Sequence, residues 1–239
     1  MSARPPVRIS VAPSRRRRRP RRALVLAALA GVGAAALVAG FWIPVKAELA
    51  QQLLNRAWAA TREATADQAH HADRADSADR ADRADRDRGK HAERTPQRPW
   101  PWADTWPVAR LTLPVSERPL TVLAGASGRN LAFGPALMDG SAMPGTAGVS
   151  VIAGHRDTHF RELGKLAIGD RFEIELPDGA SFVYEVAEID VIDAARTMVR
   201  LDAEGSIVML VTCYPFEAVA AGGSLRYVVV AYVTQGLGR

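Results

Sequence analysis

The chain has 239 residues, which allows one domain of ordinary size with appended segments. Its formal charge of +5 is unevenly distributed: residues 1–22 hold nine of the 31 Lys and Arg and no acid, so 22 basic side chains face 26 acidic ones in the remainder. The positive excess therefore belongs to the N-terminal tail, and nucleic-acid binding by the folded part is not indicated.

An uncharged segment of 21 residues, 23–43, follows the basic tail and is long enough to cross a bilayer core of about 30 Å as a helix. Arginines precede it and Phe41-Trp42 lie near its end. The positive-inside rule then keeps the tail in the cytoplasm and exports everything after Pro44. A cleaved signal peptide, the competing interpretation, normally has a shorter apolar core and a small-residue cleavage site. We therefore predict a single-pass anchor in the inner (cytoplasmic) membrane.

Two segments of different character follow the predicted anchor. Residues 44–64 have the spacing of an amphipathic helix that lies either along the membrane or on the downstream domain. The apolar residues near one face of this helix are Val45, Leu49, Leu53, Leu54 and Trp58. Residues 65–99 contain tandem Ala-Asp-Arg repeats from 72 to 86, which have no apolar stripe to bury. We predict a solvated spacer there; the alternative is a charge zipper that binds a partner.

From residue 100 onward the sequence predicts one folded domain, 100–239. Three tryptophans and three prolines fall between Pro99 and Pro107. So many large apolar rings favour a segment strapped onto the domain over a lid or a membrane contact. Strand patterns separated by turn residues follow at 109–113, 120–123, 148–154, 171–175, 181–192, 206–212 and 225–233. Seven or eight short strands with little helix indicate an all-β closed barrel or sandwich.

Three residues at predicted strand ends form the candidate site. Cys213, the only cysteine, ends a run of apolar residues; His155 lies in a turn 58 residues upstream, and Arg226 opens a strand 13 residues downstream. Acyl transfer through a thioester needs a thiol nucleophile, a proton donor for the leaving amine and a cation for the oxyanion. Taken singly, each residue has a plainer interpretation: Cys213 as a small buried hydrophobe, His155 as a hydrogen-bonded turn residue and Arg226 as a surface charge.

The sequence around these residues resembles that of sortases, the cysteine transpeptidases of bacterial surfaces. Leu210-Val211-Thr212-Cys213 is similar to the family's Thr-Leu-x-Thr-Cys signature, with Met209 at the first position. Ala153-Gly154-His155-Arg156 is similar to its histidine loop, and the order His, Cys, Arg and the gap to Arg226 agree. The resemblance covers roughly 108–233. The segments around Lys46 and the Pro-Trp-Pro-Trp stretch are similar to the Gram-negative, proteobacterial branch.

This resemblance implies an eight-stranded β-barrel in the periplasm and a protein substrate with a C-terminal sorting signal of the Leu-Pro-x-Thr-Gly kind. Cys213 would attack the Thr-Gly carbonyl, and Arg226 would stabilise the oxyanion. His155 would protonate the leaving amine and then deprotonate an amine acceptor in the cell envelope. The residues assigned to substrate binding are Thr212, His159 and Glu217. No cofactor is implied.

The sequence also offers a possible metal site, a possible helix cap and two other functions. His155 and His159 are four residues apart, but Arg156 replaces the glutamate of a His-Glu-x-x-His site and no third ligand is evident, so no metal is predicted. Asp157 is expected to cap a short helical turn at 160–164 in preference to orienting His155. Two other functions stay open: a cysteine peptidase or amidase that uses water, and a non-enzymatic envelope barrel with an inert Cys213.

Overall fold

The structure, a computed structural model, describes residues 49–67, 97–218 and 222–237. The chain divides into two compact units, Met1–Lys46 and Ala47–Arg239, and every described residue belongs to the second. The predicted basic tail, the predicted span 23–43 and the Ala-Asp-Arg repeats lie outside the described residues. Within the described ranges, no helix is long and apolar enough to cross a bilayer.

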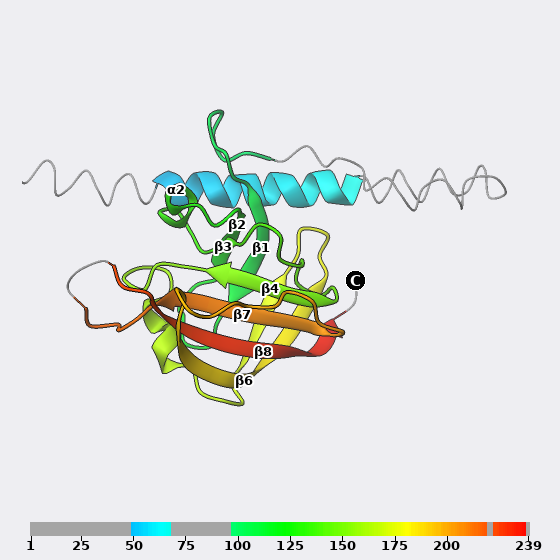
Figure 1. The fold of residues 1–239 in the computed structure, drawn as a ribbon. Coiled ribbons are helices and arrows are strands. Elements are labelled where there is room, and N and C mark those ends of the chain that lie inside the picture. Colours follow the sequence, from blue (N-terminus) through cyan, green and yellow to red (C-terminus); the bar gives the residue numbers. More distant parts are fainter. Residues whose placement is uncertain (1–48, 68–96, 219–221, 238–239) are drawn as a thin grey trace, which may run out of the picture. The chain divides into compact units, whose positions relative to one another are not determined.

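Eight strands close into a mixed β-barrel in the order β1-β2-β3-β4-β7-β8-β6-β5 (Figure 1). Their bounds are β1 Pro107–Thr112, β2 Leu120–Ala124, β3 Ala136–Leu137, β4 Gly148–Ala153, β5 Arg171–Glu175, β6 Ser181–Asp193, β7 Ser206–Cys213 and β8 Leu225–Leu237. The β2–β3 and β4–β7 pairs are parallel and the others antiparallel. The closed barrel predicted from the sequence is confirmed. Only β3 was not expected, because two residues are too few to show alternation.

Alternating burial explains why these segments form a barrel. Along β7, residues 206, 208, 210 and 212 are buried and the intervening ones are half-buried, as expected for a strand with one face in the core. Val208 and Leu210 join the main hydrophobic core together with Ile152 of β4 and Val229 of β8. The outer face of β7 is therefore the face that carries residues 207, 209, 211 and 213.

A helix over residues 49–67 packs on the barrel. Leu54 is fully buried and clusters with Leu123 of β2 and Ala136 of β3. The Gln51 side chain donates a hydrogen bond to the Phe133 carbonyl oxygen (3.0 Å). The Arg110 guanidinium lies 5.3 Å from the ring centre of Trp58, a cation–π distance. The sequence left open whether the amphipathic segment lies along the membrane or on the domain; its described part, residues 49–67, lies on the domain.

Leu54→Ala should lower the free energy of unfolding by about 2–5 kcal/mol, because it removes a fully buried side chain and leaves a cavity. Leu49→Ala is the matched control, since Leu49 is 55% exposed on the same helix and should change stability by less than about 0.5 kcal/mol. Denaturant unfolding of the two variants measures the difference. Equal, small effects would contradict the docking of this helix.

The tryptophan-rich segment lies against the domain, as the sequence predicts, except at its tip. The Trp100 and Phe133 rings meet edge to face with centres 4.8 Å apart, and the Thr105 hydroxyl donates to the Ala124 carbonyl oxygen (2.7 Å). Trp102, in contrast, is 81% exposed. The segment is therefore attached to the domain before and after Trp102, at Trp100 and Thr105, and the Trp102 ring itself is exposed.

Candidate active site

Cys213 is the last residue of β7 and lies on the outer face of the barrel. It is half-buried and carries a free thiol. The residue before it, Thr212, points into the barrel and is 2% exposed. Strand alternation thus places the thiol at the rim of the barrel, where a second molecule can approach it.

The pairing of β4, β7 and β8 brings the three predicted catalytic residues to one end of the barrel. Cys213 is directly opposite Arg226 in the antiparallel β7–β8 ladder, so the two side chains share a face. The parallel β4–β7 ladder ends at Ala153 and Val211, and the Gly154 amide then donates to the Val211 carbonyl oxygen (3.0 Å). His155 is the next residue. In Figure 1, β4 and β7 end on the same side of the barrel.

Thr212 connects the two strand ends beneath the thiol. Its hydroxyl donates a 2.7 Å hydrogen bond to the carbonyl oxygen of Gly154, the residue before His155. This buried bond fixes the residue before Cys213 to the residue before His155. The sequence assigns Thr212 to substrate binding, whereas the structure places its hydroxyl on the core side, away from the outer face that carries Cys213.

The loop after β4 holds His155 at the surface. Gly154 allows the close approach of Phe160, because a Cβ at this position would lie 2.7 Å from the Phe160 ring. Phe160 is fully buried, and its amide donates to the His155 carbonyl oxygen (3.0 Å). His155 itself is exposed. The backbone on each side of this histidine is therefore fixed while its side chain stays available to solvent.

His159 lies in the same loop with a half-buried side chain. Burial lowers the pKa of His159 below its ordinary value of 6.5, and the nearby His155 lowers it further. The Thr158 hydroxyl lies 3.2 Å from the His159 Nδ1 atom. The unfolded chain therefore binds a proton at this residue at a higher pH than the folded one does.

It follows that the contribution of His159 to stability is complete above pH 6.5 and is lost as the pH falls through the lower pKa of the folded state. Between about pH 7.5 and pH 5, the melting temperature should fall further in the wild-type protein than in His159→Gln. Thermal unfolding followed by circular dichroism measures both. Parallel declines would contradict the direction of this pKa shift.

The structure differs from the sequence-based expectation for Asp157. The short helix in this loop is a 3-10 helix, η2, at Arg161–Lys165; Phe160 precedes it and no side chain caps it. Asp157, three residues before Phe160, has its carboxylate 3.2 Å from the Arg156 Nε atom. The predicted cap is therefore wrong, because the carboxylate pairs with the neighbouring guanidinium. Arg156 is 5% exposed, and the sequence analysis gave it no role.

Arg226 opens β8 beside the thiol. Its Nη1 atom donates to the Gly223 and Leu225 carbonyl oxygens, at 3.0 and 2.8 Å. On the other side of β8, Asp193 ends β6 opposite Leu225, and the next residue, Ala194, donates its amide to the Ser224 carbonyl oxygen (2.8 Å). Hydrogen bonds, first from the Ser224 side chain and then from the Ala195 amide, lower the Asp193 pKa. Hydrogen bonds from Arg226 and from the end of β6 therefore fix the backbone at the start of β8, where the permanently charged guanidinium of Arg226 lies.

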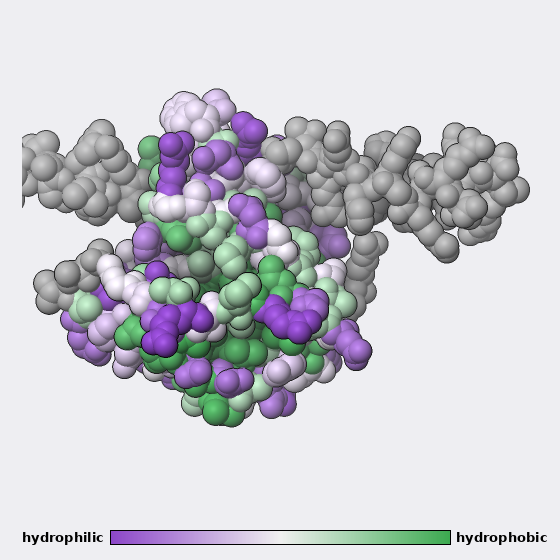
Figure 2. All heavy atoms as spheres, in the orientation of Figure 1, coloured by the Kyte–Doolittle hydropathy of each residue, from purple (hydrophilic) through white to green (hydrophobic). Residues whose placement is uncertain are grey.

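A hydrophobic surface leads to Cys213 along the outer face of β7. Ile207, Met209 and Val211 alternate with the core residues of this strand and are half-buried. Figure 2 shows hydrophobic residues gathered on the face formed by β4, β7 and β8, with hydrophilic residues on either side. This surface can accept an extended chain with apolar side chains beside the thiol.

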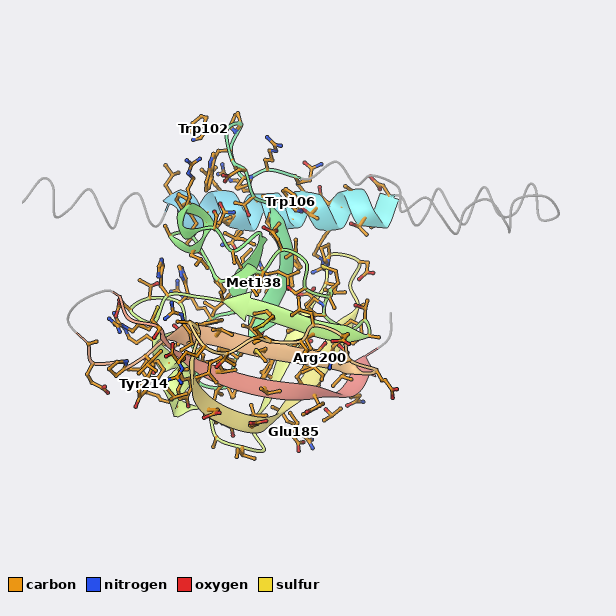
Figure 3. All side chains as sticks on the ribbon, in the orientation of Figure 1. Trp102, Trp106, Met138, Glu185, Arg200 and Tyr214 are labelled. Atoms are coloured by element: carbon orange, nitrogen blue, oxygen red, sulfur yellow. The ribbon has the colours of Figure 1, made fainter. Side chains whose placement is uncertain are left out.

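The loop between β6 and β7 runs along the length of the barrel. It begins beside Ser224, and the Leu201 carbonyl oxygen accepts a hydrogen bond from the Val149 amide (3.0 Å) near the start of β4. In Figure 3, Arg200 of this loop lies at the opposite end from Tyr214, the residue after Cys213. Met198 of the same loop is 95% exposed.

The remaining predicted site residue, Glu217, lies in the loop after β7 and is exposed. This loop is held by an aromatic cluster: the Phe216 and Tyr227 ring centres are 5.1 Å apart, and those of Tyr214 and Tyr227 are 6.3 Å apart. Among the described residues, no group of three or more His, Cys, Asp or Glu side chains is placed to hold a metal ion.

Comparison with known proteins agrees with this geometry. Residues 110–234, just over half of the chain, match the family described as "Sortase domain". Sortase D of Bacillus subtilis (strain 168) is 32% identical over 120 residues, which is 50% of this chain and 60% of that protein. Sortase A from Corynebacterium diphtheriae superposes with a TM-score of 0.50 at 28% identity, covering 56% of this chain and 63% of that one. The chain therefore spans less than two thirds of either relative, and it belongs to the sortase family.

Proposed function

We propose that the protein is a cysteine transpeptidase that cleaves a sorting signal and transfers the acyl group to an amine. The observation that carries this proposal is the position of Cys213: a free, half-buried thiol at the barrel rim, directly opposite Arg226 and beside the loop that holds His155. Membership of the sortase family supports the same chemistry.

In the first half of the proposed reaction, the Cys213 thiol passes its proton to His155, and the sulfur attacks the carbonyl carbon of the scissile peptide bond. The carbonyl electrons move to the oxygen, and the guanidinium of Arg226 stabilises the resulting oxyanion. When the oxyanion collapses, the C–N bond breaks and His155 gives a proton to the leaving amine, which would otherwise be a very poor leaving group. The product is a thioester on Cys213 and a released C-terminal peptide.

In the second half, an incoming amine attacks the thioester carbonyl and transfers its proton to His155. Collapse of this second tetrahedral intermediate breaks the C–S bond, forms a new amide bond and regenerates Cys213. The same groups act in both directions, so no further residue is required. Water in place of the amine would give a peptidase.

The substrate class proposed is a polypeptide with a signal of the Leu-Pro-x-Thr-Gly kind. The half-buried outer face of β7, made by Ile207, Met209 and Val211, suits the apolar part of such a signal. An extended chain lying along this strand would bring its Thr-Gly bond to Cys213 at the strand end.

The test uses a Leu-Pro-x-Thr-Gly peptide with and without triglycine as acceptor, read by mass spectrometry. A product extended by triglycine supports the transpeptidase. A cleaved peptide into which triglycine never enters would instead support the cysteine peptidase or amidase. If wild type and Cys213→Ala behave alike toward every peptide and thiol reagent, the barrel is a binding module.

We also propose that the enzyme is anchored in the inner membrane, with its barrel in the periplasm as in the Gram-negative branch. The support is the uncharged segment 23–43 after an arginine-rich tail. Reporter fusions after Arg98 should be active only if the reporter works in the periplasm. A cytoplasmic readout would overturn this location.

A further inference from the structure

Arg156 is a buried cation whose guanidinium reaches the loop that follows Cys213. The residue is 5% exposed, and its Nε atom pairs with Asp157 (3.2 Å). Its Nη1 atom donates to the Pro215 carbonyl oxygen and its Nη2 atom to the Ala218 carbonyl oxygen, both at 2.7 Å. A buried guanidinium is tolerated when such charge-assisted hydrogen bonds replace its water shell.

These hydrogen bonds connect the segment that carries His155 with the segment that carries Cys213. Arg156 follows His155 directly, and its two acceptors come two and five residues after Cys213. The regular β4–β7 pairing has already ended at Ala153 and Val211. Beyond that point, Gly154 bonds to Val211 and Thr212 before the predicted catalytic residues, and Arg156 bonds to Pro215 and Ala218 after them.

We propose that Arg156 is a positioning residue that fixes His155 relative to Cys213. Each of the two predicted catalytic residues lies between a Gly154 bond on one side and an Arg156 bond on the other. The planar guanidinium can donate to two separate carbonyl oxygens at once, which a lysine ammonium at the same place cannot do with the same geometry. This inference rests on the proposed function, because it assumes that His155 and Cys213 act together.

The same loop offers a matched control. Arg161 is exposed, and its Nη2 atom donates a hydrogen bond to the carbonyl oxygen of Asp157 (2.6 Å). This bond stays within the histidine loop and does not reach the loop after Cys213. Arg161→Gln therefore removes a guanidinium from the same loop without touching the connection between the two catalytic segments.

The experiment is a double-mutant cycle read by alkylation of Cys213 with iodoacetamide. Because Cys213 is the only cysteine, the alkylation rate reports on this thiol alone. His155→Ala should change the rate by roughly tenfold in the wild-type and Arg161→Gln backgrounds, an effect within the range for two coupled groups. In the Arg156→Gln background the same substitution should change the rate by less than about twofold. Arg156→Lys, which keeps the charge, should give an intermediate coupling and serves if Arg156→Gln does not fold.

Peptide cleavage provides a second readout. In Arg156→Gln, kcat should fall by roughly 10²-fold, the cost of a displaced catalytic group, and it should fall by more than KM rises, because the acceptors of Arg156, Pro215 and Ala218, lie outside the surface made by Ile207, Met209 and Val211. Full His155–Cys213 coupling in both Arg156 variants would overturn the assignment and leave the proposed function intact. If His155→Ala has no effect on alkylation even in the wild-type protein, the joint action of the two residues fails, and the assignment fails with it.

Discussion

Cys213→Ala is expected to reduce peptide cleavage by at least about 10⁵-fold, the scale seen when a nucleophile is removed from an enzyme that works through a covalent intermediate. Without the sulfur no thioester can form. The fold should persist, because the side chain is half-buried on the outer face of the barrel. Stability should change by less than about 1 kcal/mol.

A fluorogenic Leu-Pro-x-Thr-Gly peptide measures the rate, and denaturant unfolding measures the stability. Cys213→Ser serves as a second variant, since it replaces the thiol by a hydroxyl, which is a much weaker nucleophile. Cleavage by Cys213→Ala at more than about a hundredth of the wild-type rate would mean that another group performs the chemistry.

Arg226→Lys should lower kcat by about 10²–10³-fold, the usual cost of losing one oxyanion-stabilising group. Lysine keeps the positive charge but not the planar fork that donates along fixed directions. In the structure the Nη1 atom of Arg226 already donates to the Gly223 and Leu225 carbonyl oxygens, which orients the guanidinium at the start of β8. A lysine ammonium would lose this orientation.

Arg171→Lys is the matched control for this substitution. Arg171 also opens a strand, β5, but its guanidinium is paired with Glu185 at the surface (2.8 Å). Its replacement should leave kcat unchanged within about twofold, as for surface changes away from special features. If Arg226→Lys behaved like this control, Arg226 would be an ordinary surface charge.

Much of the barrel was predictable because its strands are long enough to show alternation. The segment 171–175 matches β5 residue for residue, and seven of the strands were expected within a few residues of their bounds. The two-residue β3 was missed, since parallel pairing of Ala136 and Leu137 with β2 depends on long-range contacts. The helix contact was left open for the same reason: only the fold shows that Leu123 and Ala136 meet Leu54.

Cys213, His155 and Arg226 stay predictions that rest on residue type and on the resemblance to sortases; the strand register brings their backbones to one end of the barrel. The supports depend on partners about 60 residues away: Thr212 bonds to Gly154, and Arg156 bonds to Pro215 and Ala218. A positive residue next to a candidate catalytic histidine was the one available signal for Arg156, and the sequence does not indicate its burial.

The most direct test of the central claim is the intact mass of the protein after brief exposure to a Leu-Pro-x-Thr-Gly peptide without an amine acceptor. We expect an adduct equal to the mass of the peptide up to its threonine, located on the peptide that contains Cys213 and removed by hydroxylamine. The adduct should be missing from Cys213→Ala. Peptide cleavage without any adduct, or an adduct on a residue other than Cys213, would contradict acyl transfer through this thiol.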